Sequence, residues 1–242
     1  MKSLFKLNSK VIKLNSTSIL KKVNPPKKVN SVEHMNELIN DSKVLTLIER
    51  DFFIQVKVII EKIIENKVEG DLVFVGTYRG GGALYIKSLF EELGFKNKCW
   101  LFDSFDGFNP VLLNDEENKS INLFTNKGKF NHQPTEHSVW ELFEKYNLAN
   151  NLEVVKGYIE ETVNQVSIEK IAFLHLDLDI FSSTLHALEK FYSKISKNGW
   201  VVVDDYYVNL FQCKLAVDQF REDNLLLRPI TKIGNYPAGW SV

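Results

Sequence analysis

The chain has 242 residues, a length that suits one large α/β domain with or without an N-terminal extension. Hydrophobic residues make up 44% of the sequence, which is enough to build a core and excludes wholesale disorder. No apolar run approaches the roughly 18 residues of a membrane-spanning helix. The net charge is only −1, but it is unevenly distributed along the chain.

The positive charge is concentrated near the start of the chain. Residues 1–32 contain eight lysines and no acidic residue, so this segment carries +8 and the remainder −9. We expect residues 1–32 to form a basic, solvated arm and residues 33–242 to form one domain. Contact of the arm with a membrane surface or a nucleic acid is the alternative, although the acidic remainder argues against a general nucleic-acid binder.

The chain has two cysteines, Cys99 and Cys213, and both lie in apolar stretches. They suggest neither a disulfide framework nor a cysteine-based zinc site, which fits a reducing cytoplasm. The first residues lack a continuous apolar stretch of roughly 7–15 residues, so we expect no secretory signal. The predicted localisation is therefore cytoplasmic.

Helical and strand-like patterns alternate along the chain. Residues 51–68 carry apolar side chains at spacings of three and four, which predicts a helix packed on a core. The polar stretch at 110–134 has no such pattern, and we expect it to form a lid-like loop. The other expected elements are, in chain order, strand 71–75, helix 83–93, strand 99–102, helix 138–146, strand 152–156, strand 171–176, helix 182–195, strand 200–203, helix 214–222 and two final strands at 227–233 and 239–242.

This alternation favours an α/β fold, in which helices cover both faces of a parallel sheet. Ligands of such sheets bind at the carboxyl ends of the strands. In this chain the first expected strand ends in a glycine-rich turn, and the second, fourth and fifth end in aspartate. The sequence therefore points to one edge of the sheet as the functional site.

The glycine-rich turn covers residues 76–82 (GTYRGGG). Glycine allows a ligand to approach the backbone closely, and the next helix offers free N–H groups at its N-terminus. The turn lacks the Gly-Lys-Ser/Thr of a phosphate loop. Asp103 follows Gly76 by 27 residues, where an acid can bind two ribose hydroxyls. The pair predicts a nucleoside-containing cofactor, with a plain turn and a turn aspartate as the alternative.

Four acidic residues follow two expected strands: Asp177 and Asp179 after the fourth, and Asp204 and Asp205 after the fifth. Carboxylates that converge raise one another's pKa, and a divalent cation relieves this conflict. Oxygen ligands favour Mg²⁺, Mn²⁺ or Ca²⁺ over zinc. The alternative is a set of separate, solvated loop acids.

Several segments, taken in order, resemble one protein family. They are Gly76-x-x-Arg79-Gly80-Gly81, residues 103–107 (DSFDG), 157–162 (GYIEET), 176–184 (LDLDIFSST) and 199–206 (GWVVVDDY). Over roughly residues 40–240, the chain resembles the macrocin O-methyltransferase (TylF-type) family. The resemblance implies the class I S-adenosylmethionine (SAM) methyltransferase fold. This Rossmann-like fold has a mostly parallel seven-stranded sheet, helices on both faces and a C-terminal antiparallel strand.

The resemblance also implies a function. It indicates a SAM-dependent and Mg²⁺-dependent O-methyltransferase that methylates a hydroxyl, typically on a sugar of a natural product such as an antibiotic. The partner would be a hydroxylated, glycosylated small molecule, with no nucleic acid involved. Self-association into a homo-oligomer stays open.

Roles for individual residues follow from the resemblance. The glycine turn would hold the methionine part of SAM, the acid after the second strand the ribose, and the Gly157–Tyr158 pair would lie beside the adenine. The implied cofactor residues are Gly76, Thr77, Tyr78, Arg79, Gly80, Gly81, Asp103, Ser104, Gly157, Tyr158 and Asp177. The implied metal ligands are Asp177, Asp204 and Asp205.

Two hypotheses for the general base remain. Asp179 lies two residues after the implied ligand Asp177 and is the favoured base. A histidine near the end of the expected lid, His132 or His137, is the second candidate. An exposed loop histidine is the simpler interpretation of each.

Two other functions also remain open. The family has Glu two residues before the first turn glycine, where this chain has Phe74, and this departure motivates a non-catalytic SAM-fold protein for binding or scaffolding. Trp140 and Phe130 near the lid could contact a planar acceptor, which would suit a catechol- or phenol-type O-methyltransferase.

Overall fold

A computed structural model describes residues 46–125 and 134–242 of the chain. The expected basic arm at residues 1–32 lies outside the described residues. So does the stretch 126–133, which contains His132 and Phe130. The account below concerns the described ranges.

The fold is built on one seven-stranded sheet with the strand order β3-β2-β1-β4-β5-β7-β6. The first five strands of this order run parallel, and β7 is antiparallel to both β5 and β6. The prediction of a mostly parallel sheet with a C-terminal antiparallel strand is confirmed. The strands are β1 (Asp71–Val75), β2 (Cys99–Asp103), β3 (Leu152–Lys156), β4 (Ile171–Leu176), β5 (Ile195–Val203), β6 (Thr231–Lys232) and β7 (Ala238–Ser241).

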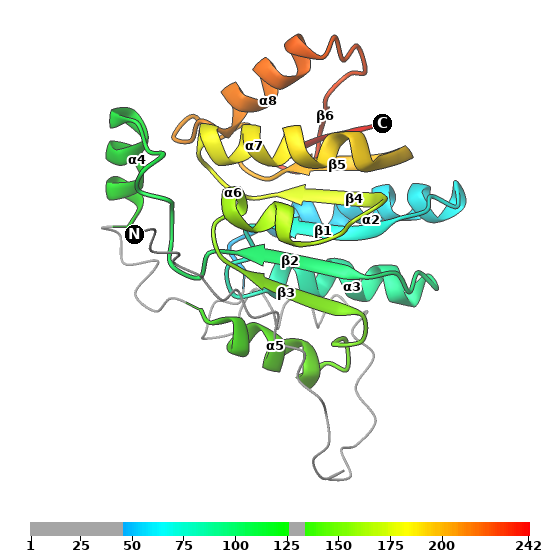
Figure 1. Cartoon of the computed structure of the whole chain (residues 1–242). Coiled ribbons are helices and arrows are strands. Elements are labelled where there is room, and N and C mark those ends of the chain that lie inside the picture. Colours follow the sequence, from blue (N-terminus) through cyan, green and yellow to red (C-terminus); the bar gives the residue numbers. More distant parts are fainter. Residues whose placement is uncertain (1–45, 126–133) are drawn as a thin grey trace, which may run out of the picture.

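Helices cover the two faces of the sheet and give it two apolar cores (Figure 1). Successive β1 side chains point to opposite faces, so Leu72 and Phe74 join one core while Val73 and Val75 join the other. One face carries α2 (Arg50–Glu65), α3 (Gly81–Glu92) and α5 (Glu136–Lys145), and the other carries α6 (Ile159–Thr162), α7 (Phe181–Phe191) and α8 (Cys213–Asp223). Within the described ranges, no helix combines the length and apolar character needed to cross a bilayer.

The expected lid-like loop at 110–134 is wrong in part, because its described residues contain the helix α4 (Asp115–Thr125). The Asn114 side chain accepts hydrogen bonds from the backbone N–H groups of Glu116 and Glu117, at 3.0 and 2.9 Å. Such a cap, followed by an acidic first turn, stabilises a helix start. In Figure 1, α4 stands beside the edge of the sheet where β4 ends and α7 begins.

The structure also moves the boundary between α7 and β5. The helix expected at 182–195 ends at Phe191, is followed by the 3₁₀ turn Tyr192–Lys194, and gives way to a strand that starts at Ile195 instead of Trp200. The segment Ser-Lys-Asn-Gly at 196–199 has the composition of a turn. The strand nevertheless continues through these residues. Asn198 adopts a positive φ of 65°, within the stretch where the register of the pairing with β4 shifts.

The end of β1 approaches β4 so closely that only glycine fits. Gly76 has a φ of +79°, and an added Cβ would lie 1.9 Å from the carbonyl oxygen of Asp177. Gly94, after α3, has a similar φ of +85° but no atom within 4 Å of an added Cβ. Gly94 is therefore a matched control for Gly76.

We expect Gly76→Ala to destabilise the protein more than Gly94→Ala. A Cβ on a left-handed backbone should lower the free energy of unfolding of both variants by roughly 1–2 kcal/mol. The steric conflict with β4 should lower that of Gly76→Ala by about 1–3 kcal/mol more. Urea unfolding measures both values. Equal losses in the two variants would contradict the close approach of β1 and β4.

Candidate active site

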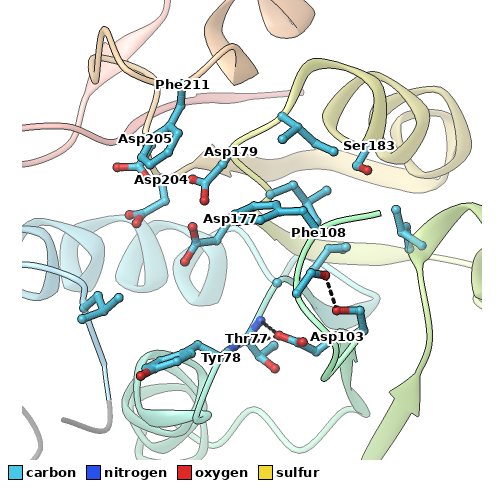
Figure 2. A pocket seen from close by; sticks show the side chains of 18 of the residues that line it. Thr77, Tyr78, Asp103, Phe108, Asp177, Asp179, Ser183, Asp204, Asp205 and Phe211 are labelled. Carbon is cyan, nitrogen blue, oxygen red and sulfur yellow. Dashed lines mark hydrogen bonds between the residues drawn. The ribbon is translucent and has the colours of Figure 1, made fainter. Parts of the chain in front are cut away.

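A cavity of about 870 Å³ lies at the carboxyl edge of the parallel strands. It runs from the turn after β1, past the end of β2, to the acidic segments that follow β4 and β5 (Figure 2). This volume lies within the range of cofactor and substrate sites. The edge that the sequence indicated is therefore hollowed in the structure.

Asp103 fixes the turn between β1 and α3. Its Oδ2 accepts hydrogen bonds from the N–H groups of Thr77 and Tyr78 at 2.7 and 2.8 Å, and its Oδ1 accepts one from Phe105 at 2.8 Å. Burial raises the pKa of Asp103 above its ordinary value, even though these three donors favour the charged form. Tyr78 has a φ of 51°, an unusual conformation that the bond to Asp103 helps to hold.

These bonds give Asp103 a structural role beside the ribose binding expected from the sequence. A carboxylate offers about four acceptor positions, and three of them already bind the chain's own backbone. About one position is left for a ribose hydroxyl. Asp103 therefore shapes the turn after β1, and its binding of the ribose stays a prediction.

The other expected cofactor residues fall into two groups. Gly76, Thr77, Tyr78, Asp103, Ser104, Gly157, Tyr158 and Asp177 all line the cavity. The described lining does not include Arg79, Gly80 or Gly81. A Cβ on Gly80 would contact Val139 of α5, and the Arg79 guanidinium lies 5.1 Å from the centre of the Tyr78 ring. Gly81 is the first residue of α3, and Gly80 is its N-cap.

The carboxylates after β4 and β5 converge in the cavity (Figure 2). Asp177, Asp179 and Asp205 each place one oxygen within 4.8 Å of the others. Burial raises the pKa of Asp177 well above its ordinary value, and the charge of Asp204 raises it further. Burial and the charge of Asp205 raise the pKa of Asp179 in the same way. The expected convergence of the four acids is thus present.

The three aspartates whose oxygens lie close together differ in one residue from the three predicted metal ligands. The sequence predicted Asp177, Asp204 and Asp205, whereas the closest three oxygens come from Asp177, Asp179 and Asp205. Asp204 remains a near neighbour, since it has the largest effect of any charged group on the pKa of Asp177. All-carboxylate oxygen donors are suited to a hard divalent cation.

Hydrogen bonds of the backbone hold these acids in place. The N–H of Asp177 donates to Val75 O at 2.8 Å, and the N–H of Asp204 donates to Leu176 O at 2.9 Å. Asp179 has a φ of 63°, and its Oδ1 is buried without a hydrogen-bond partner among the described residues. An unpaired buried oxygen of this kind is suited to a ligand.

Of the two histidines proposed as bases, His137 is not at this site. His137 lies on α5 with its side chain 69% exposed, where its Nε2 is 3.2 Å from Oε1 of Glu141, and it does not line the cavity. His132 lies outside the described residues. Asp179 is therefore the expected base that the structure places beside the other acids.

Phe74 and His175 form an aromatic floor beneath the acids. Phe74 is buried, with its ring centroid 5.9 Å from those of Phe173 and His175. Burial lowers the pKa of His175 to about 4, so its imidazole is neutral at pH 7. Among the aromatic residues offered for a planar acceptor, Trp140 packs against the core instead of lining the cavity, and Phe130 lies outside the described residues.

Sequence reasoning missed the acidic residue Glu49. Glu49, just before α2, lines the cavity and raises the pKa of Asp204 and Asp205, after burial itself. The Asn235 side-chain amide donates to its Oε2 at 2.6 Å. Nothing in its sequence neighbourhood distinguishes Glu49 from an ordinary surface acid. Only the fold brings it to this edge.

The fold and the site together define a class I SAM-dependent methyltransferase. Residues 11–241 match the family described as Macrocin-O-methyltransferase (TylF). The chain belongs to this family and is a SAM-dependent O-methyltransferase. The match begins inside the segment expected to be a basic arm.

Individual relatives agree with this assignment. The chain is 28% identical over 184 residues to the 8-demethyl-8-(2,3-dimethoxy-alpha-L-rhamnosyl)-tetracenomycin-C 4'-O-methyltransferase of Streptomyces olivaceus, covering 75% of this chain and 69% of that one. It is 30% identical over 164 residues to the demethyldecarbamoylnovobiocin O-methyltransferase of Streptomyces niveus, covering 67% and 62%. The solved structure of the O-methyltransferase NovP superimposes with a TM-score of 0.73 at 26% identity, covering 81% of each chain.

The acid cluster gives a prediction for the metal-free protein. The pKa values of Asp177, Asp179 and Asp204 are raised on folding, so the folded state binds more protons than the unfolded state above pH about 4. Stability therefore falls as the pH rises through this range. Asp179→Asn removes one like charge, and asparagine tolerates the positive φ.

In buffer with EDTA, we expect Asp179→Asn to raise the melting temperature at pH 8 by about 2–4 °C, a gain of roughly 1 kcal/mol. The gain should shrink as the pH falls toward 4, because the raised pKa values leave the aspartates of the folded cluster protonated there, so that little repulsion remains to be relieved. Asp115→Asn, on the exposed side of α4, is the control: it also removes one negative charge, but outside the cluster, and should not raise the melting temperature at pH 8. A lower melting temperature for Asp179→Asn at pH 8 would count against repulsion within the cluster.

Proposed function

We propose that this enzyme transfers the methyl group of SAM to a sugar hydroxyl of a glycosylated natural product, with Mg²⁺ as the metal. One observation carries the proposal: a single cavity joins the glycine turn after β1 to the acid cluster after β4 and β5. Methyl donor and acceptor can therefore meet in one cavity. The tetracenomycin relative, whose name specifies a rhamnosyl acceptor, supports the sugar.

The donor set supports a hard divalent cation. Asp177, Asp204 and Asp205 would hold it, and its charge would offset the repulsion that raises their pKa values. When bound, such a cation lowers the pKa of a hydroxyl and fixes its position. The cost of burying several carboxylates together is then balanced by binding.

Asp179 would act as the base. Its carbonyl oxygen accepts hydrogen bonds from the N–H groups of Gln212 and Cys213 at 3.0 and 2.9 Å, so the backbone that carries the side chain is fixed. Its unpartnered Oδ1 would accept the proton of the acceptor hydroxyl. The hydroxyl oxygen forms a bond to the methyl carbon, the bond from sulfur to that carbon breaks, and the proton stays on Asp179.

The opposite end of the cavity would bind the cofactor. Thr77 and Tyr78 would hold the methionine part, Asp103 and Ser104 the ribose, and Gly157 with Tyr158 the adenine; that all six residues line the cavity supports this assignment. A cytoplasmic location and a homo-oligomer remain predictions.

Calorimetric titration with SAM, with and without Mg²⁺, is the first test. We expect micromolar affinity despite Phe74, because Phe74 lies in the aromatic floor and leaves the turn after β1 intact. No binding under either condition would favour the non-catalytic alternative. Methyl transfer is then assayed with glycosylated and catechol-like acceptors, and turnover of catechols alone would replace the sugar with a phenol.

Base substitution gives a second test. We expect Asp179→Asn to lower kcat by roughly 10²–10⁴-fold, since the amide cannot accept the proton, while the Kd for SAM stays within about twofold. His137→Ala is the control and should keep wild-type turnover. Near-full turnover by Asp179→Asn with intact metal binding would remove Asp179 as the base.

A further inference from the structure

Helix α4 contains a buried acid with an unusual set of partners. Asp115, Glu116 and Glu117 follow one another in its first turn, and the first two are exposed while Glu117 is only 3% exposed. Buried carboxylates need partners that replace water. The oxygens of Glu117 bind backbone N–H groups.

One of these bonds reaches a distant helix. Oε1 of Glu117 accepts a hydrogen bond from the N–H of Phe181 at 2.7 Å, and Oε2 accepts one from the N–H of Asn114 at 3.0 Å. Phe181 is the first residue of α7, and the preceding Ile180 supplies no side-chain cap. Glu117 therefore caps α7 from 64 residues away, and its charge suits the positive end of that helix.

A second connection links α4 to α8. The Asn114 side-chain amide donates to Oε1 of Gln212 at 2.9 Å, and Nε2 of Gln212 donates to Oε2 of Glu116 at 3.1 Å. Gln212 precedes α8, and its backbone N–H donates to the carbonyl oxygen of Asp179 at 3.0 Å. The start of α4 is thus bonded to α7, which follows Asp179 in the chain, and to the residue that holds the Asp179 carbonyl.

We propose that Glu117 is a positioning residue, which docks α4 against α7 and α8 and so fixes the backbone of Asp179. The inference rests on the proposed function, in which Asp179 is the base. Helix α4 also contributes Asn118, Ile121 and Asn122 to the cavity lining. The same carboxylate therefore places the base and the wall of the cavity that α4 forms.

The proposal predicts different effects of a Glu117 substitution at the two ends of the cavity. Loss of Glu117 loosens Asp179 and α4, but it leaves the bonds between Asp103 and the turn after β1 untouched. Methyl transfer and acceptor binding should therefore weaken while SAM affinity stays the same. A general loss of structure would lower all three.

Amide hydrogen exchange, read residue by residue by NMR on the full chain, tests the connection without an acceptor. In Glu117→Ala we expect at least tenfold faster exchange at Gln212 and Cys213, two amides that Glu117 does not contact. Glu117→Gln keeps one acceptor oxygen and should give an intermediate increase in the exchange rates at Gln212 and Cys213. If the alanine variant does not fold, the glutamine variant takes its place in the test. Asp115→Ala, on the same turn but exposed, is the matched control. Unchanged exchange at Gln212 and Cys213, with faster exchange at Phe181 only, would overturn the proposal.

Kinetics give the second readout, with a rhamnosylated tetracenomycin as the acceptor probe. We expect Glu117→Ala to lower kcat about tenfold and raise the acceptor KM, with the SAM Kd within twofold and partial recovery in Glu117→Gln. A matching loss of SAM affinity would indicate a general structural role and contradict the proposal. If the wild-type enzyme binds no SAM, the proposed function fails, while the exchange experiment still decides whether Glu117 holds the Asp179 segment.

Discussion

The repulsion among the aspartates at the ends of β4 and β5 is the constraint around which the site is arranged. The parallel ladder fixes their positions, because the N–H groups of Asp177 and Asp204 still bond to the neighbouring strands. The acids cannot move apart without breaking the sheet. Burial is the larger cause of their raised pKa values, and the repulsion adds to it. Functional sites commonly hold such unfavourable arrangements, and the rest of the fold supplies the stability.

Acidic residues at this edge of the sheet serve two different purposes. Asp103 and Glu117 use their oxygens to bind backbone N–H groups, and each ties together segments that are distant in the sequence. Asp179 has a buried oxygen without such a partner, and it is available for chemistry. Carboxylates at this edge therefore build the scaffold in one place and, in the proposed mechanism, accept a proton in the other. The difference lies only in what surrounds each carboxylate.

This difference explains what the sequence could and could not predict. The core strands were readable because buried parallel strands are short apolar runs, and β1, β3 and β4 have the expected bounds. The convergence of the acids followed from strand ends alone. The partners of Asp103 and Glu117 were not readable, since they depend on backbone groups brought near by the tertiary fold. Helix α4 did carry a local signal, Asn114 followed by three acids, but its weak apolar pattern hid it.

The bonds of Asp103 to the turn after β1 have a consequence for the thermodynamics of binding. Because these bonds exist within the chain itself, the turn has its conformation before any ligand arrives. The conformational entropy of the turn is lost when the protein folds, so cofactor binding does not have to order the turn a second time. The wall on the α4 side rests instead on a few side-chain bonds to α7 and α8. A turn that is ordered before the donor arrives thus lies beside a wall held by side chains, and the wall can be altered without breaking the bonds that order the turn.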